Sequence, residues 1–184
     1  TVEYRSGPTM AAAERMRITV TGSQTHGAVP WKGVDPIAIS SQIITALQTI
    51  VAREVNITQV PAVVTIGSIH GGVRNNIIPE EVVMEGTIRT FNDEVRKDIH
   101  DSIRKKAEMI ASASGATAKV EIFIDIAKVT FNEPSLTDKM VPSLERVYGK
   151  ENVKITPFIT GAEDFPFFTD HAPGLYFFNG VAPD

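Results

Sequence analysis

The sequence predicts an α+β fold in which a ferredoxin-like βαββαβ domain makes up the larger part of the chain. Apolar and polar residues alternate over strand-length segments, apolar residues recur at helical spacing over two longer segments, and these segments follow one another in the order βαββαβ. Right-handed crossovers then give a four-stranded antiparallel sheet with both helices on one face. The first and last strands are neighbours in this arrangement, so the chain enters and leaves the domain at one place.

The first strand is expected over residues 15–21, and it leads through a turn that contains His26 into the first helix, Ile37 to Arg53. Asp35 is expected to cap this helix, and Pro36 stands at its first position, where a missing N–H costs nothing. Apolar residues mark the buried faces of both elements: Met16, Ile18 and Val20 in the strand, and Ile39, Ile43, Leu47, Ile50 and Val51 in the helix.

The second half of the domain follows the same logic. A β-branched, uncharged strand runs from Ala62 to Ile69, and a long turn leads to a third strand, Glu81 to Thr90. A second helix begins at Asn92 or Asp93 and ends at Gly115. Four apolar residues then alternate through the fourth strand: Val120, Ile122, Ile124 and Ile126.

The ends of the chain do not look like an independent domain. Residues 1–13 have no periodicity and read as a linker or the end of another domain segment. Residues 128–184 suggest a short helix over 135–148 and strands over 153–158 and 175–178. A segment of this length buries too little apolar surface to form a hydrophobic core of its own. The expected organisation is therefore an inserted domain over residues 14–127, with a partial second domain on either side.

The amino-acid composition limits the classes of partner that this chain is expected to bind. The net charge is -4 with interspersed signs, so no basic stripe for nucleic acid exists. No apolar run reaches the ~20 residues that a membrane-spanning helix needs. The chain has no cysteine, which excludes a disulfide framework and a thiolate metal site within it. It begins without a methionine or signal peptide, as a processed, truncated or excerpted chain would, so its compartment stays open.

Polar residues whose side chains could take part in catalysis or binding lie in the turns and at a strand end. His26 belongs to a Thr-His-Gly-Ala turn, Asn76 precedes Ile-Ile-Pro, and Arg89 lies in Gly-Thr-Ile-Arg on the side of its strand away from the core. An imidazole and a carboxamide can donate hydrogen bonds to a developing oxyanion, and a guanidinium can bind a carboxylate through two parallel bonds. Taken singly, these are also a loop histidine, a turn asparagine and a solvated arginine.

Together with the Gly-Ala-Glu-Asp-Phe segment at 161–165, these motifs resemble the M20 metallopeptidase and amidohydrolase family, above all its N-acyl-amino-acid amidohydrolases of the hippurate hydrolase type. The resemblance covers nearly the whole chain. It implies a zinc-aminopeptidase-like α/β catalytic domain with a one- or two-metal centre, usually zinc or manganese. Residues 14–127 would be its inserted lid or dimerisation domain, and residues 128–184 a C-terminal part of the catalytic domain.

The resemblance also implies roles for individual residues. His26 would be catalytic, reaching across the dimer to polarise the scissile carbonyl, while Asn76 and Arg89 would bind the substrate. Ile77 stands where valine is common. Gly161 and Glu163 would line the site as substrate-binding residues, with metal ligation or helix capping as alternatives for Glu163.

No metal ligand is assigned within this chain. The family's upstream ligands and catalytic glutamate precede the inserted domain, and its last histidine ligand would follow Asp184. The four histidines show no ligand spacing among themselves, and His171 reads as a surface turn residue. The chain by itself is therefore expected to be inactive.

A homodimer is expected from the edges of the sheet. Charged residues protect the fourth strand, whereas residues 62–66 carry none, and an unprotected apolar edge normally needs a partner. The strand from Ala62 to Ile69 and the helix from Ile37 to Arg53 are expected to pair with their copies about a two-fold axis. The alternatives are a non-catalytic ferredoxin-like dimerisation or small-molecule-binding module, or another M20 branch, a carboxypeptidase, dipeptidase or deacylase.

Overall fold

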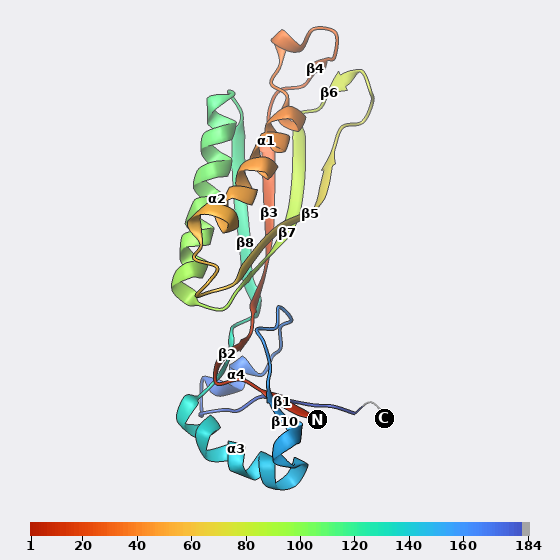
Figure 1. Ribbon diagram of the computed structural model, residues 1–184. Helices are drawn as coiled ribbons and strands as arrows, with labels where there is room; N and C mark the ends of the chain where they lie inside the picture. Colours follow the sequence, from red (N-terminus) through yellow and green to blue (C-terminus); the bar gives the residue numbers. More distant parts are fainter. Residues whose placement is uncertain (182–184) are drawn as a thin grey trace. The chain divides into compact units, whose positions relative to one another are not determined.

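The computed structural model describes residues 1–181, apart from the side chains of residues 124–126, and contains helices and strands in both of its compact units (Figure 1). The four-stranded unit comprises Glu14–Ile88 and Asp93–Asp125. The terminal unit comprises Thr1–Ala13, Arg89–Asn92 and Ile126–Asp184. The α+β class predicted from the sequence is confirmed.

The main sheet has four strands in the order β5-β7-β3-β8. Their bounds are Ala12–Thr21 for β3, Ala62–Gly71 for β5, Glu81–Thr90 for β7 and Thr117–Ala127 for β8. The first and last of these strands, β3 and β8, are neighbours, as the βαββαβ order predicted. Strands β5 and β8 form the two edges.

Both long helices cover one face of this sheet (Figure 1). Helix α1 spans Pro36–Thr49 and continues as a π-helical turn, Ile50–Glu54, whereas α2 spans Asp93–Ala113. The π-helical turn differs from the regular helix expected to Arg53, because the Val55 N–H bonds to the Ile50 carbonyl five residues earlier. The buried core includes the residues that the periodicity picked out: Met16, Ile18, Val20, Ile39, Ile43, Leu47 and Ile50.

Asp35 caps α1 as predicted. Its Oδ1 accepts hydrogen bonds from the N–H groups of Ile37 at 2.9 Å and Ala38 at 3.3 Å. The cap satisfies two of the amide donors that the start of a helix leaves unpaired, so the position where the chain leaves the histidine turn is fixed.

A buried polar pair joins β3 to α2. The His100 Nε2 donates to the Glu14 carboxylate at 2.6 Å, and both side chains are almost fully buried. The Arg96 guanidinium lies 3.9 Å from the other carboxylate oxygen. A buried carboxylate is costly unless it is hydrogen-bonded, so this pair fixes the register between the strand and the helix.

The terminal unit has strands where a linker was expected. Strand β1, Val2–Tyr4, lies between β10, Val153–Ile155, and β11, Phe177–Asn179. Strand β2, Gly7–Met10, pairs antiparallel with β9, Thr130–Asn132. The expectation of an irregular segment over residues 1–13 is therefore wrong, because strands of three or four residues are specified by distant partners and have no periodicity of their own.

The remaining elements are short. Helix α3 is close to the expected 135–148, whereas β10 and β11 are shorter than the strands expected there. Their bounds complete the chain: η1 Pro30–Lys32, α3 Pro134–Tyr148, η3 Lys150–Asn152 and α4 Pro166–Thr169, with the two-residue strands β4 Thr25–His26 and β6 Ile77–Ile78. Among residues 1–181, no helix combines the length and apolar character needed to cross a bilayer.

Asn132 binds three segments of the terminal unit together. Its Nδ2 donates to the carbonyls of Arg5 and Tyr176, each at 2.8 Å, and its Oδ1 accepts from the Tyr176 N–H at 2.6 Å. The residue is fully buried. Because burial raises the cost of unpaired backbone groups, this single carboxamide makes the approach of these segments specific.

Replacing Asn132 with alanine should lower the free energy of unfolding of the intact protein by about 3 kcal/mol, since it removes both partners of the Tyr176 backbone at this site and one of the two hydrogen bonds to the Arg5 carbonyl. Denaturant titration would measure the loss. Asn152→Ala is the matched control, because Asn152 Nδ2 also donates to a carbonyl, that of Tyr148, at a half-buried position. Equal losses for the two variants would contradict the role given to Asn132.

Candidate functional site

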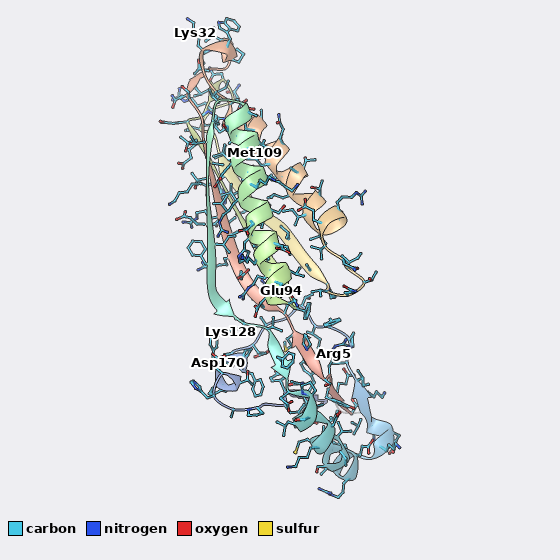
Figure 2. All side chains as sticks on the ribbon, turned by 90° about the vertical axis from the view of Figure 1, so that its left-hand side faces the viewer. Arg5, Lys32, Glu94, Met109, Lys128 and Asp170 are labelled. Atoms are coloured by element: carbon cyan, nitrogen blue, oxygen red, sulfur yellow. The ribbon has the colours of Figure 1, made fainter. Side chains whose placement is uncertain are left out.

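His26 lies in a two-stranded ribbon at one end of the four-stranded unit (Figure 1). Strands β4 and β6 pair antiparallel, with Thr25 opposite Ile78 and His26 opposite Ile77. Lys32, just beyond this ribbon, marks the same end in Figure 2, far from Glu94 at the start of α2. The imidazole is exposed.

Gly27 brings Asn76 next to His26. Its N–H donates to the Asn76 carbonyl at 2.8 Å, and a Cβ added at Gly27 would lie 3.2 Å from that same oxygen. A larger residue would therefore fit only if the neighbouring turn shifted by a few tenths of an ångström. Of the five residues predicted to form the site, the structure thus brings together His26 and Asn76.

The backbone of the turn selects the tautomer of His26. The Ala28 N–H donates to the His26 Nδ1 at 3.1 Å, so Nδ1 is an acceptor and the ring hydrogen of the neutral imidazole resides on Nε2. The Val29 N–H donates to the His26 carbonyl at 2.9 Å and closes the turn. An exposed Nε2–H donor therefore lies on a turn that backbone hydrogen bonds close.

The base of the turn is equally constrained. Ser23 and Val34 exchange two backbone hydrogen bonds of 3.0 Å. A Cβ added at Gly33 would lie 2.5 Å from the Ser23 carbonyl oxygen, so only glycine fits there without displacing the backbone. The segment from the first strand to the cap of α1 therefore behaves as one ordered loop, which suits a residue that must hold a donor in place.

Arg89, Gly161 and Glu163 belong to the terminal unit. Arg89 is half-buried in β7, between the buried residues Ile88 and Thr90. The Gly161 carbonyl accepts from the Ala11 N–H at 3.1 Å, which ties its loop to the segment after β2.

Glu163 is exposed and does not cap a helix. The following helix, α4, begins after Phe165, and no side chain caps it, so the helix-capping alternative for Glu163 is wrong. Burial, and then the negative charges of Glu163 and Asp164, raise the pKa of Tyr176 above its ordinary value. The carboxylates therefore lie close enough to influence that phenol.

Among residues 1–181, no three histidine or acidic side chains come together as a metal site requires. His171 lies in an exposed turn, as predicted. The hydrogen-bond donors that the predicted site residues offer are the imidazole of His26, the carboxamide of Asn76 and the guanidinium of Arg89.

The sequence did not indicate the structural roles of Asn132 in the terminal unit or of Ile77 in the four-stranded unit. Neither belongs to a periodic pattern: Asn132 acts through backbone groups that are distant in sequence, and Ile77 owes its place beside His26 to the pairing of two short strands. The proline that follows Ile78 was the available signal for a constrained turn.

Comparison with known proteins identifies the architecture. Residues 13–114 match the family model of the peptidase dimerisation domain of M20 enzymes. The chain is 39% identical to thermostable carboxypeptidase 2 of Saccharolobus solfataricus over 96% of its length and 44% of that protein. It is 37% identical to the N-acetyl-L-cysteine deacetylase of Bacillus subtilis over 100% of its length and 43% of that protein.

A solved structure gives the same result. The YXEP protein of Bacillus subtilis, described as a dinuclear metal-binding peptidase of the M20 family, superposes with a TM-score of 0.75 at 28% identity. The match covers 96% of this chain and 42% of that structure. The chain therefore spans less than half of the length of the relatives it matches.

The tautomer of His26 can be measured directly. In the intact ¹⁵N-labelled protein at a pH where the imidazole is neutral, two-bond ¹H–¹⁵N spectra should show a protonated Nε2 and an unprotonated Nδ1, because Ala28 occupies Nδ1. The exposed turn residue His171 serves as the reference. A protonated Nδ1 at His26 would contradict this assignment.

Proposed function

The chain belongs to the M20 peptidase family, and on this basis we propose that it supplies the lid and part of the catalytic domain of a metal-dependent amidohydrolase. In this proposal residues 14–127 form the inserted lid, and residues 1–13 and 128–184 belong to the catalytic domain. The substrate is an N-acyl amino acid or small peptide, and the products are a carboxylate and an amino acid. A divalent metal, zinc or manganese, held by ligands outside this chain, supplies Lewis-acid chemistry.

The observation that carries the proposal is the fixed Nε2–H of His26 beside Asn76. When water adds to an amide, negative charge develops on the carbonyl oxygen, and preorganised donors stabilise that charge. His26 donates to this oxygen as the catalytic residue, and the Asn76 carboxamide adds a second donor. Because the backbone already holds the imidazole in the required tautomer, no reorganisation is needed when the charge develops.

In this proposal three residues of the terminal unit, Arg89, Gly161 and Glu163, also bind substrate in the full-length dimer. The Arg89 guanidinium binds the free carboxylate of the amino acid through parallel hydrogen bonds, which suits the planar shapes of both groups. Gly161 and Glu163, on the loop tied to residue 11, position the substrate. In this proposal Arg89 makes the enzyme selective for substrates whose amino acid has a free carboxylate.

A carboxypeptidase is the second candidate. The relative at 39% identity is named a carboxypeptidase, whereas the relative at 37% is named a deacetylase. Both reactions hydrolyse an amide bond next to an amino acid, so the same donors serve either one. A non-catalytic binding module is less well supported, because the relatives that match 96% and 100% of this chain are named as a carboxypeptidase and a deacetylase.

The partner of this chain is a second copy of itself. Helix α1 and strand β5 pack together, and neither contains Lys, Arg, Asp or Glu. The opposite edge is charged: Lys119 and Glu121 lie on β8, and α2 exposes Asp93, Glu94, Lys97, Asp98, Asp101, Lys105 and Glu108. The uncharged edge of β5 and the outer face of α1 therefore pair with their copies about a two-fold axis.

Replacing His26 with alanine in the full-length enzyme should lower kcat by about 10²- to 10³-fold, as expected for loss of an oxyanion donor. Metal content measured by elemental analysis should remain unchanged, because His26 is not a ligand. His171→Ala provides the control with ordinary activity. Loss of metal in His26→Ala would assign the residue to the metal centre and contradict the proposed role.

Replacing Thr65 with lysine should shift the protein from dimer to monomer, because it places like charges at the paired β5 edges. Sedimentation velocity at micromolar concentration measures the change. Thr117→Lys makes the same substitution at an exposed position on the other edge strand, β8, and should leave the dimer intact. The interface assignment fails if Thr117→Lys dissociates the dimer and Thr65→Lys does not.

A further inference from the structure

The ribbon that carries His26 also borders a pocket. The pocket has a volume of about 550 Å³, within the range of small-molecule sites, and it lies wholly in the four-stranded unit. Val73, Ile77 and Pro79 form its apolar lining, and Arg74, Glu80 and Glu81 contribute charged side chains. None of the residue roles proposed above involves this pocket.

Strand pairing places the lining of this pocket beside the imidazole. His26 and Ile77 are directly opposite each other in the antiparallel β4–β6 ribbon. Directly opposite residues project their side chains from the same face, with their Cβ atoms about 5 Å apart. Ile77 is half-buried and belongs to the lining of the pocket, so the pocket borders the residue directly opposite His26.

The lining indicates the chemistry of the occupant. Val73 is 89% exposed and leaves an apolar side chain for a ligand to cover. One arginine stands against two glutamates, so the charged residues of the pocket carry a net negative charge. An uncharged aliphatic group fits this lining, whereas a second carboxylate would be repelled.

We propose that this pocket binds the acyl group of the substrate, that Ile77 sets the preferred acyl length, and that the preferred acyl groups are uncharged aliphatic chains. The inference rests on the proposed amidohydrolase function. With the amide carbonyl oxygen at the His26 Nε2, the acyl chain extends along the same face of the ribbon, past Ile77 and toward Val73. Trimming Ile77 then gives room for a longer chain and removes contact with a short one.

The test measures kcat/KM of the full-length enzyme for the N-acetyl, N-butanoyl, N-hexanoyl and N-succinyl derivatives of one amino acid. Burial of one methylene changes binding by a factor of about four, so Ile77→Val should raise the hexanoyl-to-acetyl ratio about four-fold. Ile77→Ala should raise it ten-fold or more. The succinyl derivative should be at least ten-fold poorer than the butanoyl derivative in the unsubstituted enzyme.

Ile57→Ala is the matched control, because it removes the same side chain from a 60% exposed position in the segment before β5. Its acyl-length ratio should equal that of the unsubstituted enzyme. Ile77→Val carries the test by itself if Ile77→Ala yields no folded dimer.

The outcomes separate the two proposals. An unchanged ratio in the Ile77 variants, an equal shift in Ile57→Ala, or a preference for the succinyl group overturns the pocket assignment while hydrolysis leaves the amidohydrolase function standing. Absence of hydrolysis for every N-acyl amino acid by the metal-loaded enzyme overturns the function and the pocket assignment together.

Discussion

The hydrogen bond from the Gly27 N–H to the Asn76 carbonyl, at 2.8 Å, is the contact on which the candidate site depends. It joins two turns that are separated in the sequence by helix α1 and strand β5. A Cβ at position 27 would lie 3.2 Å from the Asn76 carbonyl oxygen, so a larger residue would make the neighbouring turn shift by a few tenths of an ångström. The strand pairing next to this contact places Ile77 opposite His26, and Ile77 in turn lines the pocket. This backbone contact thus joins the turn of the donor to the turn that leads to Ile77.

The four-stranded unit separates its charges between two sides. Helix α2 and strand β8 present many charged side chains, whereas α1 and β5 present an uncharged surface. A charged edge discourages further strand pairing, and an uncharged one favours it. This distribution of charge favours association through the β5 edge, in keeping with the proposed two-fold dimer. The buried Glu14–His100 pair supports this architecture from within, by fixing α2 against β3.

The terminal unit depends on specific polar contacts more than on apolar packing. Asn132 satisfies backbone groups of segments far apart in sequence, and Lys128 pairs with Asp170 at 2.5 Å on the surface (Figure 2). Its strands are three or four residues long. Such elements gain little from propensity, so the bonds that join them determine where the loop of Gly161 and Glu163 lies.

The sequence by itself determined the elements that are long enough to carry a period. Alternation marked β3, helical spacing marked α1 and α2, and Asp35 with Pro36 marked where α1 begins, because these signals depend on neighbouring residues alone. The motifs around His26 and Asn76 also made these residues candidate donors, through their resemblance to motifs of the M20 family. The tertiary structure decided what depends on distant partners: the strands within residues 1–13, the absence of a capping role for Glu163, the tautomer of His26 and the place of Ile77. Short strands and single hydrogen bonds obtain their specificity from groups that the local sequence does not contain, so only the folded chain could assign them.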